Sequence, residues 1–212
     1  MIDEVFKILK RETKKYKVPL IEFVKVQDND PFKILIATIL SARTNDKTTA
    51  EVCKRLFEKV KNFKDLEKLK VEEIEKLIYP VGFYKNKAKS LKRLPEKIKE
   101  FKGIPNNIDD LIKLPGVGRK TANLVLVNAF DKDAIGVDVH VHRISNRLGY
   151  VKTKNPGETE KILREKLPRK YWKDINRLFV MLGQNICKPV SPYCSKCPIN
   201  KYCKKVGVKK TR

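Results

Sequence analysis

Acidic residues are scarce in this chain of 212 residues, and long apolar segments are missing altogether. No apolar run reaches the roughly 18 residues that a membrane-spanning helix needs, and the longest candidate, 34–40, fits a buried helix. No secretion signal is recognisable either, because the first residues, 1–4, are charged. These absences exclude a membrane-spanning protein and predict an intracellular one without a membrane partner.

Histidines are few, and strand patterns are missing. His140 and His142 are the only two histidines, and with no third ligand in register they are not expected to bind a metal ion. No segment alternates polar and apolar residues between hairpin turns. Apolar residues instead recur at helical spacing, as at Val5, Ile8 and Leu9. The chain is therefore predicted to be all-α.

Polar residues mark where several helices should begin. Asp30 precedes a proline and predicts a helix over 32–42, because proline is favoured at the first helical position. Asn155 also precedes a proline and predicts another helix start. Asp46 and Asp65 are predicted to cap two further helices.

The shortage of acidic residues leaves a large positive charge. The chain has 49 basic and 25 acidic residues, which gives a net charge of +24. Such an imbalance is typical of proteins that bind a polyanion, and nucleic acid is the usual one. A lysine-rich surface adapted to heat is the alternative, but that surface would normally carry matching glutamates. The charge therefore favours a nucleic-acid partner.

Four of the five cysteines lie close together near the C-terminus, at Cys187, Cys194, Cys197 and Cys203. Four thiolates in this spacing can enclose one metal centre, either zinc or an iron–sulfur cluster. Two disulfides are the alternative, but disulfides are rare inside cells. Zinc sites commonly use two short gaps of similar length, and here only one gap is short, which favours iron–sulfur. Cys53 stands apart and is expected to be a packed core thiol.

Residues 114–122 read Leu-Pro-Gly-Val-Gly-Arg-Lys-Thr-Ala. Asn107 can cap a short helix before this segment, ending at 114, and 121–130 should form a helix after it. Gly116 supplies the positive φ of a tight turn, and Gly118 allows a close approach to the backbone. The free N–H groups of the second helix would bind a phosphate. The alternative is an ordinary helix–turn–helix corner that binds no ligand.

The hairpin, the Val-Asp-Val-His stretch 137–140 and the cysteine spacing together resemble the endonuclease III family of DNA glycosylases. These enzymes belong to the helix-hairpin-helix, Gly/Pro-rich, aspartate superfamily. The resemblance covers about 35–203. It implies double-stranded DNA with a damaged pyrimidine or an abasic site as partner, a monomer, and a cytoplasmic location, nucleoid-associated in a prokaryote.

The family fold has two all-helical domains with the DNA cleft between them. By resemblance, the six-helix domain is placed at 24–134. The second domain would join 1–23 to 135–212. It would hold a [4Fe-4S] cluster in the cysteine loop, 187–203.

The resemblance also implies catalytic roles for Lys120 and Asp138. A lysine at position 120 is typical of the bifunctional members, in which it attacks C1′ and forms a Schiff base. Asp138 would stabilise the positive sugar as the base leaves and would deprotonate the lysine. The non-catalytic alternatives are that Lys120 only contacts a phosphate and that Asp138 only caps the next helix.

Base flipping leaves a gap in the duplex that side chains must fill. The family's two filler positions correspond here to Arg43 and Phe83. A phenylalanine can serve as an apolar wedge between bases. A glutamine is common at the position of Arg43. The arginine bears on how the base opposite the flipped nucleotide is recognised, and it does not change the predicted catalytic class.

Further DNA contacts are expected on both halves of the chain. The expected residues are Gly116, Gly118 and Arg119 in the hairpin, His140 in or beside the pocket, and Lys188 and Lys196 in the cysteine loop. Two other functions stay open at this point. A mismatch-specific glycosylase usually has another residue in place of Lys120. A non-catalytic helix-hairpin-helix module with structural zinc would have no reason to keep Lys120 together with Asp138.

Overall fold

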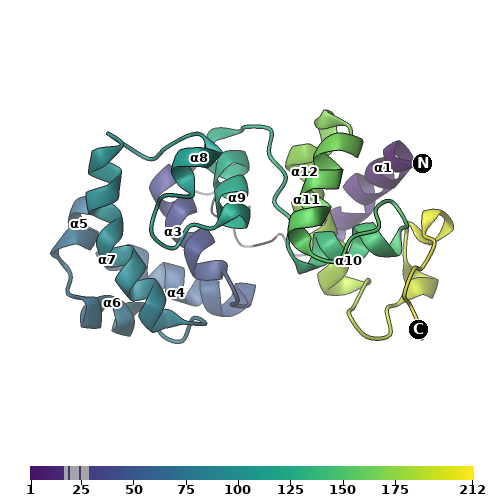
Figure 1. Cartoon of the computed structure of the whole chain (residues 1–212). Coiled ribbons are helices and arrows are strands. Elements are labelled where there is room, and N and C mark those ends of the chain that lie inside the picture. The colour runs from purple at the N-terminus through teal and green to yellow at the C-terminus, as the bar shows by residue number, and fades with distance from the viewer. Residues whose placement is uncertain (17–18, 20–23, 25–28) are drawn as a thin grey trace. The chain divides into compact units, whose positions relative to one another are not determined.

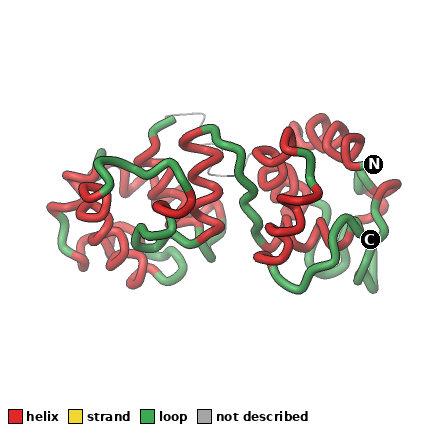
Figure 2. Tube along the Cα trace, turned by 45° about the horizontal axis from the view of Figure 1, so that its top comes forward, coloured by secondary structure: helices red, strands yellow, loops and turns green. Residues whose placement is uncertain are grey.

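Helices are the only regular elements in the part of the chain that the structure describes. The computed structural model describes residues 1–16, 19, 24 and 29–212. Figure 2 shows these residues as helices joined by loops, which confirms the all-α prediction. The chain divides into two compact units, Leu20–Lys132 on the one hand and Met1–Pro19 with Asp133–Arg212 on the other. No helix in the described ranges is long and apolar enough to cross a membrane.

The unit Leu20–Lys132 is built around one apolar helix, α3 (Pro31–Ser41) (Figure 1). Eight side chains of α3 are buried, because most positions of this helix are apolar. Helix α3 packs most extensively against α9 and then against α4. In the described residues of the unit, the other helices are α4 (Asp46–Lys59), α5 (Phe63–Lys68), α6 (Val71–Ile78), α7 (Tyr84–Glu100), α8 (Ile108–Leu111) and α9 (Arg119–Phe130).

Of the caps predicted at Asp30, Asn155, Asp46 and Asp65, the first two are confirmed and the last two are wrong. The side chain of Asp30 accepts a hydrogen bond from the N–H of Phe32, and Asn155 caps the helix that follows it. Helix α4 is instead capped by Asn45, one residue before the predicted cap, and α5 by Asn62, three residues before it. Asp46 and Asp65 lie inside the first turn, where the helix dipole also favours a carboxylate.

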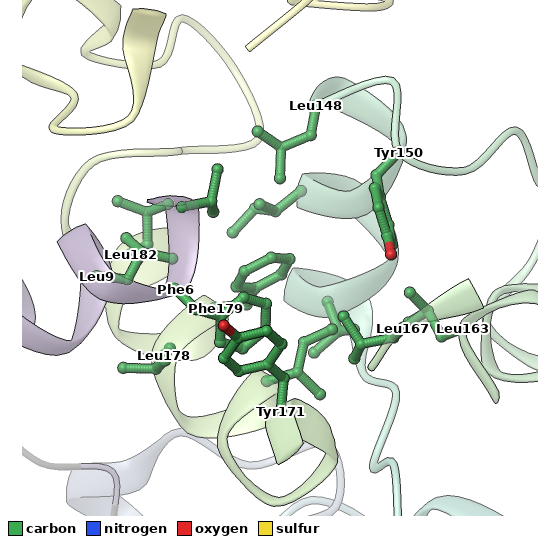
Figure 3. Close-up of a cluster of buried hydrophobic side chains, with 14 of the residues drawn as sticks. Phe6, Leu9, Leu148, Tyr150, Leu163, Leu167, Tyr171, Leu178, Phe179 and Leu182 are labelled. Carbon is green, nitrogen blue, oxygen red and sulfur yellow. The ribbon is translucent and has the colours of Figure 1, made fainter. Parts of the chain in front are cut away.

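The second unit joins the N-terminal helix to the C-terminal third of the chain. Its helices are α1 (Ile2–Glu12), α10 (Val139–Arg147), α11 (Pro156–Lys166) and α12 (Trp172–Asn185). Figure 3 shows its buried core, in which Phe6 of α1 stacks on Tyr171 with 4.0 Å between ring centroids and lies beside Phe179 of α12. The hydroxyl of Tyr171 donates to Asp3 at 2.7 Å. The N-terminal helix is therefore part of the same core as α12.

Candidate functional site

The glycine-rich turn joins α8 to α9. Gly116 has a φ of 78°, in the left-handed region that favours glycine, as the sequence predicted. A Cβ added to Gly116 would lie 3.1 Å from Cβ of Ser90, so the turn packs tightly against α7. Helix α8 ends at Leu111 rather than at 114. Helix α9 begins at Arg119, earlier than the predicted 121.

The first turn of α9 presents an exposed, basic surface. The N-cap Gly118 and the next two residues, Arg119 and Lys120, are all exposed. No side chain caps this helix end, and its first turn contains no acidic residue. A Cβ on Gly118 would meet no atom within 4 Å, so an anion has room beside the backbone. Backbone N–H groups and the positive end of the helix dipole suit this position to a phosphate.

Asp138 is the N-cap of α10, which confirms its predicted capping role. Its Oδ1 accepts hydrogen bonds from the backbone N–H groups of His140 and Val141, each at 2.8 Å. The other carboxylate oxygen, Oδ2, accepts no hydrogen bond from the described residues. The cap therefore occupies one oxygen and leaves the second for another role. Lys120 and Asp138 belong to different units.

The two histidines lie on α10 and do not share a site. Nδ1 of His140 lies 3.0 Å from Nη2 of Arg143. A Cβ on Gly183 of α12 would lie 2.3 Å from the same His140 nitrogen, so only glycine leaves space for this ring. Nδ1 of His142 instead contacts the hydroxyl of Thr159 at 2.7 Å.

Arg43 and Phe83 come from two loops that the fold brings together. The guanidinium carbon of Arg43 lies 5.2 Å from the centroid of the Phe83 ring, a cation–π contact. Phe83 is 59% exposed, which is unusual for so large an apolar side chain. Both residues have a left-handed backbone, with φ of 54° and 58°. Such a conformation costs about 1–3 kcal/mol for a residue other than glycine and is often found at functional sites.

The four clustered cysteines line one pocket. Cys187, Cys194, Cys197 and Cys203 surround it together with Arg147 and Tyr193, among other residues. None of the four forms a disulfide. In the described ranges, no three His, Cys, Asp or Glu side chains are gathered as ligands of a single metal ion. The set of four soft thiol donors around one space fits an iron–sulfur cluster, which is wider than one ion.

The thiols of this pocket need a positive partner to be deprotonated. Burial, together with the smaller effect of the neighbouring cysteines, raises the pKa of Cys197 to about 11. Burial likewise raises the pKa of Cys203. Iron bound in the pocket would supply that positive charge, since a coordinating thiol is deprotonated. Cys53, outside the pocket, is 4% exposed, and burial raises its pKa to about 12, which confirms the prediction of a packed core thiol.

Two arginines on α10 hold the start of the cysteine loop, and sequence reasoning missed both. Nη2 of Arg143 donates to the carbonyl oxygen of Cys187 at 2.8 Å. One turn later, Arg147 donates to the carbonyl oxygen of Lys188 at 2.7 Å and to Sγ of Cys187 at 3.3 Å. The spacing of four places both arginines on one helix face, and this spacing was the available signal.

The two lysines predicted to contact DNA from the cysteine loop differ in their surroundings. Lys196 is exposed. Lys188 is partly buried, and its ammonium group donates to the carbonyl oxygen of Gln184. Lys188 therefore already has a protein acceptor for one of its donors.

A family model for base excision DNA repair proteins of the HhH-GPD superfamily matches residues 36–169. Endonuclease III of Thermotoga maritima is 45% identical over 179 residues, which cover 84% of this chain and 84% of that protein. A solved non-covalent endonuclease III–DNA complex has a TM-score of 0.85 at 35% identity and covers 96% of this chain and 94% of that one. A trapped covalent endonuclease III–DNA intermediate has a TM-score of 0.81 at 35% identity, over 97% and 96% of the two chains.

The helical fold, the hairpin and these matches define a base excision DNA repair protein of the HhH-GPD superfamily. Within the superfamily, this chain belongs to the endonuclease III family. It is accordingly a bifunctional DNA glycosylase and AP lyase of base excision repair. The family carries a [4Fe-4S] cluster.

Proposed function

We propose that Lys120 is the nucleophile of this enzyme and that Asp138 is its partner in base release. The observation that carries the proposal is Lys120 itself, an exposed lysine in the first turn of the hairpin's second helix. A glycosylase without lyase chemistry has no need of an amine there. The substrate class is double-stranded DNA with an oxidised or ring-saturated pyrimidine, or with an abasic site.

The proposed chemistry runs in two stages. The damaged nucleotide is flipped out of the stack, and the neutral amine of Lys120 bonds to C1′ while the bond from C1′ to the base breaks. The base leaves with that electron pair and is protonated, and the amine loses a proton to Asp138 or water. The sugar ring then opens to a Schiff base. Removal of a C2′ proton expels the 3′ phosphate, and the strand breaks on the 3′ side.

Asp138 acts on the positive charge that develops on the sugar. Its two capping hydrogen bonds fix Oδ1 and orient the side chain, while Oδ2 is still able to accept hydrogen bonds. Gly116, Gly118 and Arg119 would hold a DNA phosphate at the N-terminus of α9. His140, Lys188 and Lys196 would add contacts from the other unit, and the net charge of +24 favours DNA in general.

Two further proposals concern the domain boundaries and the cellular location of the protein. We place the six-helix domain at 24–134 and the second domain at 1–23 with 135–212, and the division into two compact units supports this. A DNA substrate also supports a cytoplasmic, nucleoid-associated location if the source is a prokaryote.

The function is tested with a panel of duplexes, each with one lesion, incubated with the purified protein and borohydride. Oxidised pyrimidines and abasic sites should give a stable protein–DNA adduct, because borohydride reduces a Schiff base to an amine. Undamaged duplex is the control. Base release without any adduct would contradict the lyase chemistry, and no reaction with any lesion would contradict the function itself.

Phe83 and Arg43 are proposed to fill the gap left by the flipped nucleotide. Phe83→Ala should slow single-turnover excision from duplex DNA roughly tenfold, because base–aromatic stacking contributes about 1–3 kcal/mol. The effect on single-stranded substrate should be smaller, since no stack has to be opened there. Phe83→Leu keeps an apolar side chain and should retain most of the rate.

Arg43→Gln should change the preference among bases opposite the lesion. Arg93→Gln removes the same charge from an exposed position on α7 and serves as its control. If the Phe83 and Arg43 changes leave duplex excision and opposite-base preference as in the wild type, the two residues do not fill the gap.

Cys187, Cys194, Cys197 and Cys203 are proposed to bind a [4Fe-4S] cluster in the pocket that they line. Protein purified without oxygen should be brown and contain about four iron and four sulfide per chain. Cys194→Ser should lower the iron content and the stability, whereas Cys53→Ala, at a core thiol, should leave the iron content unchanged. Stoichiometric zinc without inorganic sulfide would contradict the cluster.

A further inference from the structure

Lys87 is a buried lysine on the apolar face of α7. It is only 8% exposed. Its position falls in one stripe with the buried residues Leu91, Leu94 and Ile98, at the spacing of a helix face that packs inward. A lysine is almost never buried to this extent unless its ammonium group is paired. The ammonium group of Lys87 is therefore expected to have hydrogen-bond partners inside the protein.

The ammonium group of Lys87 ties α7 to the end of α3. It donates to the carbonyl oxygens of Leu40 at 2.8 Å and Ala42 at 2.6 Å, and it lies 3.3 Å from the hydroxyl of Thr44. Burial lowers the pKa of Lys87 to about 8, so the group is still mostly protonated at neutral pH. All three donors of the ammonium are thus directed at oxygens of the turn that contains Arg43.

The same turn is locked to the loop that contains Phe83. The hydroxyl of Thr44 accepts a hydrogen bond from the N–H of Gly82 at 3.0 Å. A Cβ on Gly82 would lie 2.4 Å from the carbonyl oxygen of Arg43, so only glycine permits this close approach. Lys87, Thr44 and Gly82 therefore form one junction between the two loops.

The junction accounts for the unusual backbone at Arg43 and Phe83. Both have a positive φ, a conformation that persists only where the surroundings fix it. Each lies next to a residue of the junction, Arg43 before Thr44 and Phe83 after Gly82. Ser90, one turn after Lys87, packs against Gly116 of the hairpin turn. One face of α7 therefore supports both the loop pair and the hairpin.

We propose that Lys87 is a positioning residue for opening the duplex: its ammonium group holds the 40–44 turn so that Arg43 stacks on Phe83 before DNA arrives. The proposal rests on the proposed gap-filling role of these two side chains. A preformed pair lowers the ordering cost of insertion, because neither backbone nor ring has to find its conformation during flipping. Lys87 itself need not touch DNA.

The test compares Lys87→Met with Lys92→Met. Methionine keeps the length of the lysine stem and removes the donors. Lys92 is the matched control on the same helix, since its ammonium donates to the carbonyl oxygens of Glu67 and Leu69 at 2.7 and 2.8 Å, at the end of α5. Both variants lose one positive charge and two carbonyl contacts of α7. Only Lys87→Met disturbs the turn of Arg43.

Three quantities are measured for each variant: the melting temperature, single-turnover excision from duplex and from single-stranded substrate, and the fluorescence of a base analogue beside the lesion that brightens on unstacking. Lys87→Met should slow duplex excision roughly 10–100-fold, because a misplacement of about 1 Å can cost this much. Single-strand excision should change much less, and the fluorescence rise should slow in parallel with duplex excision. Lys92→Met should leave the duplex-to-single-strand ratio as in the wild type.

Thr44→Val tests the same junction without a buried lysine being replaced. Valine keeps the shape of threonine and removes the oxygen that contacts both Gly82 and Lys87. It should lower the duplex-to-single-strand ratio in the same direction, and it serves as the test if Lys87→Met does not fold. An unchanged ratio and an unchanged fluorescence rise in the folded variants would overturn the proposal. Inactive wild-type protein would instead overturn the proposed function.

Discussion

Lys120→Gln should abolish borohydride trapping and strand cleavage while leaving DNA binding nearly intact. The amine is the atom that forms the Schiff base, and an amide cannot replace it as a nucleophile. Binding should persist, because the phosphate site at the start of α9 consists mainly of backbone N–H groups, and no side chain caps this end of the helix. The loss of one charge should weaken binding slightly and in a salt-dependent way.

The measurement is a gel that separates free DNA from the covalent adduct, on duplexes with an abasic site or an oxidised pyrimidine. Lys54→Gln removes an exposed lysine from α4 in the same unit and should trap as the wild type does. Equal trapping by the wild type and Lys120→Gln would remove Lys120 as the nucleophile. Such a result would revive the reading of Lys120 as a phosphate contact only.

Asp138→Asn should slow base release by roughly 10²–10⁴-fold, the range expected when a positioned acid–base group is lost. Asparagine caps a helix about as well as aspartate, so the bonds from the N–H groups of His140 and Val141 to Oδ1 should survive. The fold and DNA binding should then be unchanged. Cleavage at a preformed abasic site should slow less, because no base has to leave there.

Asp30→Asn is the matched control, since Asp30 is also an N-cap whose side chain accepts from a backbone N–H. It should excise the base at the wild-type rate. A third variant, Asp138→Ala, removes the cap as well and should lower the stability by a further 0.5–2 kcal/mol or so. If Asp138→Asn releases the base as fast as Asp30→Asn, the role of Asp138 is capping alone.

The sequence alone determined the features that depend on neighbouring residues. The caps at Asp30 and Asn155, the positive φ of Gly116 and the basic start of α9 all follow from local backbone rules, and the structure has them. The family resemblance came from three short motifs, and the comparisons confirm the family. Asp46 and Asp65 were placed wrongly as caps because an acidic residue is favoured both at the cap and within the first turn.

Only the tertiary structure decided which distant residues act together. Lys87 reads as an ordinary surface lysine until α3 and its turn are packed against α7 and supply three oxygens for its ammonium. Arg143 and Arg147 likewise gain a role only when the cysteine loop folds back on α10. A residue's local pattern sets its backbone, whereas the acceptor that makes a buried charge tolerable can lie more than forty residues away and is set by packing alone.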